Sequence, residues 1–280
     1  MSKYYYLIAG LPELALEDNT LNYTVRSFRD ELYPDLSRKD KALIDLFYLK
    51  FDNQNLLQLL KDKEFEPKHY GIYDKEELLS LINIIKVGEE QAKGFPGYLI
   101  SFVENYMNED YAEEVLLENI LTSKYYEHAQ KCSNKFVRSW FQFNQTINNL
   151  LIAYAGRKYD IKYQEHILGS DEISNQIRIS GARDFGLSNK LEYITTLSQI
   201  ADEENLVQRE KQIDQLRWNW MEEVTFFNYF TIERVFVFLL QIEMVERWLS
   251  LDKEEGNKYF REIISSLKQD VQIPEQFRKK

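Results

Sequence analysis

The sequence predicts an all-α fold, and three observations carry this prediction. Only 10 Gly and 5 Pro occur in the 280 residues, fewer than a loop-rich or all-β chain needs. Apolar residues recur at steps of three and four over long stretches, which is the spacing of one helix face. Similar helical segments also occur at residues 51–63, 141–158 and 228–241, each with a polar residue inside an apolar stretch.

At the N-terminus, residues 4–9 are expected to form a short extended segment, which a Gly-Leu-Pro turn closes. Thr20 or Asn22 is placed to cap the first helix, and Pro34 stops that helix because proline cannot continue it. Helices joined by loops are predicted for most of the remaining chain.

Helices are predicted in close succession through the first half. Ser37 opens one, with Asp40 three residues later, which is close to a capping box. Asp52 or Asn53 is expected to cap the first of the three similar segments. Further helices are predicted at residues 75–86, 98–107 and 111–131, with a loop at 88–97 and Asp110 as a cap.

The second half is predicted to contain the longest helices. Residues 133–154 carry one continuous apolar stripe, which Gly156 is expected to end. Residues 169–187 are polar and contain glycine, so they are expected to form a linker. No Gly or Pro occurs in residues 206–251, which predicts one very long helix or two joined by a kink.

Within that last stretch, residues 226–240 are apolar on nearly every side and are expected to form a buried central helix. A terminal helix at residues 257–270 and a frayed basic tail after Pro274 complete the predicted elements.

Charge, cysteine content and hydropathy limit the partners and the cellular location that the sequence predicts. The net charge of −11 argues against nucleic acid and against direct contact with an anionic bilayer. The single Cys132 cannot form an internal disulfide, which favours a reducing cytoplasm. The apolar N-terminal run lacks a cleavage site, and the apolar run at residues 235–240 is too short to span a bilayer. We therefore expect a soluble protein of the cytoplasm.

No catalytic, cofactor or metal site is predicted. The sequence has no GxxxxGK[ST] loop, and the DFG triplet at residues 184–186 lacks the other kinase motifs. Of the three histidines, only His69 follows a Glu by three residues, and Pro67 between them disfavours the helix that a di-iron ligand pair needs. We expect the chain not to be an enzyme.

The three similar segments can be aligned with one another. Asn55 matches Asn149 at an offset of 94 residues, and Thr146 matches Thr231 at an offset of 85. The chain is thus interpreted as one helical domain, 1–280, made of three repeat units at 1–96, 97–187 and 188–280.

Polar residues inside these apolar segments have two interpretations. A buried Asn in a helix needs a hydrogen-bond partner, so the simpler one is that they bond neighbouring helices and set their register. The alternative is that they face a shared polar interior or groove that a partner protein occupies. The candidate contact residues are then Asn55, Asn148, Asn149, Arg157, Glu233 and Arg234.

Three segments also carry a family resemblance: KYYYLIAGLP, FYLKFDNQNLLQLLK and INNLLIAYAGRKY. Together they resemble a bacterial family usually encoded with V-type ATPase subunits. That family is similar to the V/A-type ATPase central-axis subunit, which is called C in prokaryotic complexes and d in eukaryotic ones. Its helices carry an acid or Asn, then Asn, then Leu/Ile-rich residues with a trailing Lys or Arg. The Glu233-Arg234 pair departs from this pattern, since Arg stands where Asn is expected.

The resemblance implies a three-fold helical funnel on the cytoplasmic face of the membrane rotor ring. Such a protein would join the central shaft to the ring, without catalysis, a cofactor, nucleic acid or membrane insertion. The shaft subunits and the ring would be its partners. Two alternatives stay open: a helical scaffold or adaptor of another assembly, and an all-α enzyme with a polar pocket between helices.

Overall fold

The computed structural model describes residues 4–67, 71–88, 92–109, 111, 116–228 and 230–270, with side chains described as far as residue 252. Within these ranges every regular element is a helix and no strand occurs, so the predicted all-α class is confirmed. None of the helices described there combines the length and the apolar composition that crossing a bilayer requires.

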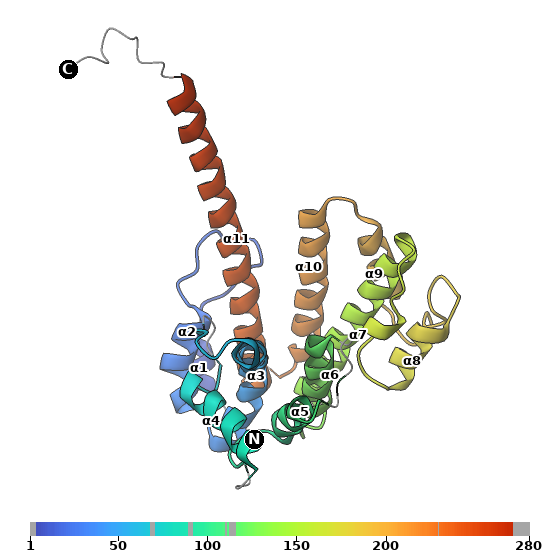
Figure 1. The fold of residues 1–280 in the computed structure, drawn as a ribbon. Helices are drawn as coiled ribbons and strands as arrows, with labels where there is room; N and C mark the ends of the chain where they lie inside the picture. The colour runs from blue at the N-terminus through green and yellow to red at the C-terminus, as the bar shows by residue number, and fades with distance from the viewer. Residues whose placement is uncertain are drawn as a thin grey trace, which may run out of the picture.

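The helices follow one another along the chain, joined by connections of different lengths (Figure 1). The α-helices are α1 Tyr5–Ala9, α2 Val25–Ser27, α3 Arg38–Lys61, α4 Lys75–Val87, α5 Gly97–Met107, α6 Leu117–Ala129, α7 Lys135–Lys158, α8 Glu172–Ile179, α9 Ile194–Asp202, α10 Leu206–Thr225 and α11 Ile232–Asp270. A π-helical turn at Phe28–Leu32 and 3-10 turns at Tyr33–Asp35 and Gln164–His166 lie between them.

Three long helices, α3, α7 and α11, organise this arrangement. They begin at Arg38, Lys135 and Ile232, so successive starts are 97 residues apart. Ser37 caps α3 and Asn134 caps α7 by accepting a backbone N–H from the first turn. The remaining helices pack around these three, with α6 and α8 against α7 and α10 beside α11 (Figure 1).

The fifteenth residue of α3 holds a neighbouring segment in place. This residue is Asp52, which is fully buried. Its carboxylate accepts the backbone N–H groups of Ile72 and Tyr73 at 2.8 and 3.0 Å, just before Asp74 caps α4. Gly71 is required beside it, because a Cβ there would lie 1.9 Å from an Asp52 oxygen.

The fifteenth residues of α7 and α11 make the corresponding contacts. Asn149 donates to the carbonyl of Leu168 and accepts its N–H, both at 2.8 Å, three residues before the cap of α8. Glu246 accepts the N–H of Val25, the first residue of α2, at 3.1 Å. In each long helix the side chain of the fifteenth residue therefore bonds backbone groups at or just before the start of a shorter helix.

These positions revise the register of the proposed repeat. Asn55 is the eighteenth residue of α3, Asn149 the fifteenth of α7 and Arg234 the third of α11, so the sequence alignment does not pair equivalent positions. An offset of 97 residues brings the three helix starts together in place of 94 and 85. The equal spacing is what a threefold repeat requires, and the repeat itself stays a prediction.

Near the N-terminus the structure differs from the prediction. Residues expected to be extended form the single helical turn α1, which buries Ile8 while the Tyr5 ring packs on Phe230 at 4.7 Å. Thr24 caps α2, through a capping box with Ser27, rather than Thr20 or Asn22. These tertiary and side-chain contacts override the local preference of the Tyr-rich segment.

Other predicted helix ends were also wrong. Asp52 and Asn53 do not cap a helix but lie buried inside α3. Gly156 does not end α7, which continues to Lys158 with Gly156 packed against Tyr163. The predicted linker contains α8, which Asp171 caps.

The described residues from 206 onward form α10 and α11, and the predicted terminal helix is the continuation of α11 (Figure 1). Phe226 and Phe227, expected in the buried central helix, lie in the turn between the two helices and are exposed. Asp110 and the basic tail fall outside the described residues.

Candidate functional site

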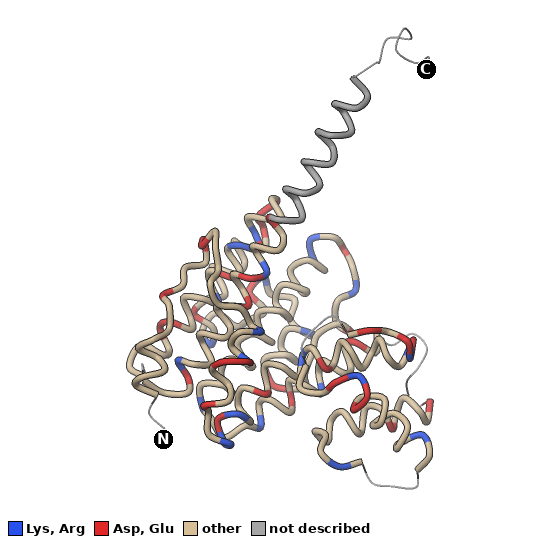
Figure 2. Tube along the Cα trace, turned by 90° about the vertical axis from the view of Figure 1, so that its left-hand side faces the viewer, with Lys and Arg blue, Asp and Glu red and all other residues tan. Residues whose placement is uncertain are grey.

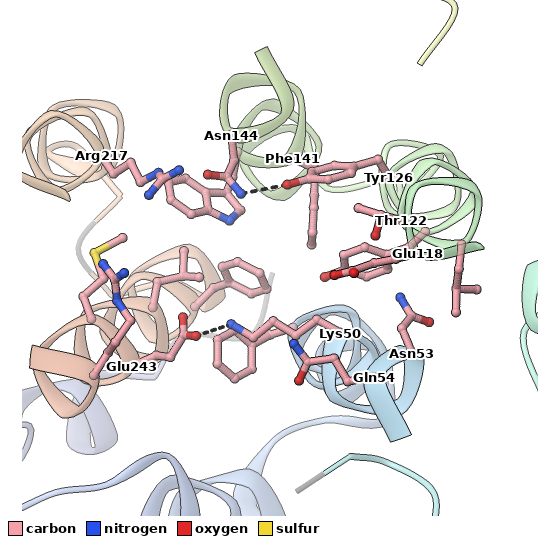
Figure 3. Close-up of a pocket in the computed structure, with 18 of the residues that line it drawn as sticks. Lys50, Asn53, Gln54, Glu118, Thr122, Tyr126, Phe141, Asn144, Arg217 and Glu243 are labelled. Atoms are coloured by element: carbon pink, nitrogen blue, oxygen red, sulfur yellow. Dashed lines mark hydrogen bonds and ion pairs between the residues drawn. The ribbon is translucent and has the colours of Figure 1, made fainter. Parts of the chain in front are cut away.

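A cavity of about 380 Å³ lies where the long helices come together (Figure 3). We call it the central cavity. Its walls come from α3, α6, α7, α10 and α11, so all three long helices contribute. Its polar and charged lining residues are Lys50, Asn53, Gln54, Glu118, Thr122, Tyr125, Tyr126, Asn144, Asp214, Arg217, Glu243 and Arg247.

An ion pair joins two walls of the central cavity. Lys50 Nζ of α3 lies 2.6 Å from Glu243 Oε1 of α11, and 4.1 Å from the centre of the Phe47 ring (Figure 3). Burial lowers the pKa of the Lys50 ammonium, and the Glu243 carboxylate opposes that shift. About a third of each side chain stays exposed, 29% and 33%. The pair thus faces the cavity rather than the closed core.

The α10 wall is built on a buried carboxylate. Asp214 is 1% exposed, and its oxygens accept hydrogen bonds from Arg247, from Arg217 at 3.2 Å and from Trp248 Nε1 at 2.9 Å. A buried carboxylate needs this number of donors, because its loss of hydration is costly. Asp214 therefore fixes the orientation of both arginines.

The wall formed by α6 and α7 carries one charged side chain, Glu118, among neutral hydrogen-bonding groups. The Tyr126 hydroxyl accepts a hydrogen bond from Asn144 at 2.9 Å (Figure 3). It accepts a second one from Asn148 at 3.3 Å, and Asn148 in turn accepts one from Arg217 at 2.8 Å. Burial raises the pKa of Tyr126, so its hydroxyl stays protonated at neutral pH. This chain of bonds links three helices across the cavity.

The charges of the central cavity balance. Three cationic and three anionic side chains line it: Lys50, Arg217, Arg247, Glu118, Asp214 and Glu243. Acidic and basic positions are likewise interspersed along the rest of the described chain (Figure 2). The net charge of −11 is therefore not concentrated in this cavity.

The comparisons with known proteins can now be added. A family model described as protein of unknown function, DUF2764, matches residues 1–271. The chain belongs to the DUF2764 family. No curated protein and no solved structure matches it. The family description assigns no activity, so the function of this DUF2764 protein must be argued from its own geometry.

The structure separates the six contact residues predicted from the sequence. In this DUF2764 chain Asn55 and Asn149 are 1% and 0% exposed, so neither offers its amide to a partner in this conformation. Asn149 also bonds Ser174 at 3.2 Å, as expected if it sets helix register. None of the six lines the central cavity, but Asn148 bonds two residues that do, Tyr126 and Arg217.

Arg157 holds a loop. Its guanidinium donates to the carbonyls of Ser180 and Ala182 at 2.6 Å each and lies 3.8 Å from the centre of the Phe185 ring. These bonds fasten the segment after α8 to the end of α7, which explains Arg157 without a partner protein.

Glu233 and Arg234 lie at the start of α11, away from the central cavity. Glu233 accepts a hydrogen bond from Asn134 at 2.7 Å, while Arg234 binds both oxygens of Glu222 at 2.8 Å. Asn55, Asn149 and the Glu233–Arg234 pair therefore do not face one shared groove in this structure. Contact of the six residues with a partner protein stays a prediction.

The charged residues of the central cavity were not predicted from the sequence. Glu243 interrupts an apolar run, and this is a usable signal for a polar contact. Lys50 likewise interrupts the apolar run at residues 46–51, whereas nothing in the sequence distinguishes Asp214 and Arg217 from the polar and charged residues around them.

The histidines contribute no metal centre to this picture. His128 packs on the Tyr98 ring at 5.1 Å, and burial lowers its pKa. His166 lies 3.2 Å from the Asn119 amide, and His69 is outside the described residues. No cluster of three or more His, Cys, Asp or Glu side chains suited to a metal occurs in the described part of the chain.

Proposed function

We propose that this DUF2764 protein is a non-catalytic coupling subunit of a V/A-type rotary ATPase, which joins the central shaft to the membrane rotor ring. The observation that carries the proposal is the equal spacing of α3, α7 and α11, together with their use of one helix position to hold a neighbouring segment. A three-fold helical protein is what the sequence resemblance implies, and this spacing supports it independently.

The central cavity also supports the proposal. Its ionic groups are engaged with one another across helix boundaries, as Lys50 of α3 with Glu243 of α11 and Arg247 of α11 with Asp214 of α10. Such pairs fix helices relative to each other, and a part that transmits torque needs a stiff, closely packed body. The exposed fractions of Lys50 and Glu243 leave polar groups available to a protein segment that enters.

The test is purification of the tagged protein from its native host under conditions that preserve membrane complexes. We expect shaft subunits and the rotor ring to co-purify in fixed ratio. Deletion of the gene should uncouple the complex, so that ATP hydrolysis continues while ATP-driven ion transport is lost. Isolation of an intact, fully coupled complex that lacks the protein would refute the proposal.

The same purification separates the alternatives. A helical scaffold of another assembly would return a reproducible set of partners without ATPase subunits. An enzyme would need a small-molecule site, for which the Lys50–Glu243 pair in the central cavity is the specific candidate. A metabolite that raises the melting temperature of the wild type, but not of Lys50→Met, would favour that alternative.

A further inference from the structure

A group of exposed aromatic side chains surrounds the start of α11. We define the aromatic patch as Tyr5, Tyr6, Phe226, Phe227 and Phe230. Tyr6 and Phe227 are 97% and 92% exposed, and Phe226 is 72% exposed. The ring centres of Tyr5 and Phe230 lie 4.7 Å apart, and those of Phe226 and Phe227 lie 5.0 Å apart. The patch therefore contains two pairs of rings in contact. Clustered exposed aromatics of this kind mark interaction surfaces.

A second cavity, of about 610 Å³, adjoins the aromatic patch. We call it the N-terminal cavity, because the first residues of α3, α7 and α11 all line it. Val224 and Asn228, on either side of Phe226 and Phe227, line the same cavity. On its other side Tyr4 donates to Asp40 at 2.5 Å and to the Phe230 carbonyl at 3.1 Å, which joins the segment before α1 to both features.

One carboxylate in the N-terminal cavity is incompletely bonded. Glu233 is 7% exposed, its Oε1 accepts the Asn134 amide, and its Oε2 is buried with no hydrogen-bond partner. By contrast, Asp40 in the same cavity accepts hydrogen bonds from Tyr4 and Ser37. A buried charged acceptor without a donor is unfavourable, so Glu233 is poised to accept a donor from outside.

The surrounding charges are consistent with a cationic donor. Lys39 and Lys135 also line the cavity, but both are exposed and screened by water, whereas Glu233 is buried. Glu233 and Asp40 lie in the first turns of α11 and α3, where each carboxylate offsets the partial positive charge of its helix end. The interior of the cavity therefore keeps an anionic acceptor.

We propose that the aromatic patch and the N-terminal cavity form one docking surface for a partner protein. The partner inserts a Lys or Arg side chain that donates to Glu233 Oε2, and its flanking apolar residues cover the aromatic patch. A buried charge-assisted bond ringed by aromatic side chains is the usual composition of an interface hot spot. This surface does not depend on the assignment to a rotary ATPase.

The test uses the full-length protein and a display library of random peptides. Peptides are selected on the wild type and counter-selected on a Phe226→Ser/Phe227→Ser variant, whose changes are fully on the surface. We expect enrichment of one Lys or Arg flanked by apolar residues. The selected peptides should lose about tenfold or more in affinity for the double variant, as expected for hot-spot removal. An Ile161→Ser/Ile179→Ser variant is the matched control, since these apolar residues are 61% and 79% exposed elsewhere.

Glu233→Gln then tests the basic contact. A selected peptide and its copy with citrulline in place of arginine are compared on both proteins, and the preference for arginine should vanish on Glu233→Gln. Selection of peptides without a basic residue, or an unchanged arginine preference on Glu233→Gln, would overturn the proposal. So would binding to anionic phospholipid vesicles through the aromatic patch with no peptide selected. The Phe226→Ser/Phe227→Ser variant leaves the core unchanged. If Glu233→Gln folds poorly, the loss of peptide affinity in that double variant still tests the proposal.

Discussion

The first and second long helices hold their neighbouring segments from the same position with different chemical groups. In α3 the residue is Asp52, an acceptor only, and it faces two backbone N–H groups. In α7 it is Asn149, which faces both the N–H and the carbonyl of Leu168. The residue at this position therefore matches the backbone groups that it faces. Asp suits two N–H donors, whereas Asn suits one N–H donor and one carbonyl acceptor.

Because Asp52 can ionise and Asn149 cannot, the two contacts also respond differently to pH. Burial raises the pKa of Asp52 to about 6, although the N–H groups of Ile72 and Tyr73 pull it down. Asn149 carries no charge, so the corresponding contact in α7 does not titrate. We expect the contribution of the Asp52 contact to the free energy of unfolding to depend on pH, and the contribution of the Asn149 contact not to.

The largest effect is expected for Asn149→Asp. The carboxylate would face the Leu168 carbonyl at the position of the present 2.8 Å hydrogen bond, and the buried charge would have no cationic partner. We expect a loss of about 3–5 kcal/mol in the free energy of unfolding at pH 7, smaller at pH 5 where the acid protonates. Urea unfolding followed by circular dichroism measures it.

Asn148→Asp is the matched control for that substitution. Asn148 is partly exposed and accepts a hydrogen bond from Arg217, so a carboxylate there keeps a cationic partner. We expect a change of about 1 kcal/mol or less. Equal losses for the two variants would contradict the role given to Asn149.

The next largest effect is expected for Asp52→Asn. One amide oxygen can accept only one of the two N–H groups with good geometry, and its NH₂ would face the other, which costs about 1–3 kcal/mol at pH 8. The folded pKa of Asp52 lies above its ordinary value of 3.8, so the folded state binds the proton more tightly than the unfolded state. This contribution favours folding at low pH and is lost as pH rises from about 4 through about 6.

The free energy of unfolding measured from pH 4 to pH 8 tests whether folding raises or lowers the pKa of Asp52. The difference between wild type and Asp52→Asn should shrink as the pH rises through this window, because only the wild type loses the protonation term. A difference that grows over the same range would show that the pKa of Asp52 is lowered in the folded state.

A third test concerns the glycine beside Asp52. Gly71→Ala places a Cβ against the carboxylate, and we expect a loss of about 2 kcal/mol from overpacking. The loss should be smaller in an Asp52→Ala background, where the obstructing oxygens are gone. Gly181→Ala has open space around it and serves as the control. Additive effects of Gly71→Ala and Asp52→Ala would argue that the two residues are not coupled.

The smallest effect is expected in the third long helix. Glu246→Gln keeps an oxygen that can accept the Val25 N–H, so we expect a change of about 0.5 kcal/mol or less, whereas Glu246→Ala should cost about 1 kcal/mol. Thermal unfolding distinguishes them. If Gln proved as harmful as Ala, the contact would depend on charge and would differ from the contacts of α3 and α7.

Local signals predicted much of the fold. The cap at Ser37 and the bounds of α4 and α5 depend on residues within one or two turns, and these were predicted to within a residue or two. Asp52 was assigned as a cap because Asp favours that role, but its partners at Ile72 and Tyr73 lie some twenty residues away. No pattern within the helix reports such a contact.

The repeat register failed for a related reason. An apolar stripe nearly superimposes on itself after a shift of three or four residues, so an offset of 94 fits the stripe almost as well as 97. The helix starts decide between them, and they depend on caps such as Asn134. The Lys50–Glu243 pair of the central cavity joins helices from opposite ends of the chain, and sequence spacing cannot reveal it.

The bond between Glu246 and Val25 has a consequence for how the protein is made. It connects residues 221 positions apart, and it places the start of the chain against its last long helix. At ribosomal rates of roughly 5–20 residues per second, α2 waits on the order of 10–40 s before its partner is synthesised. The segment around Val25 must therefore stay free of wrong pairings during that interval, and this contact forms only once α11 has been synthesised.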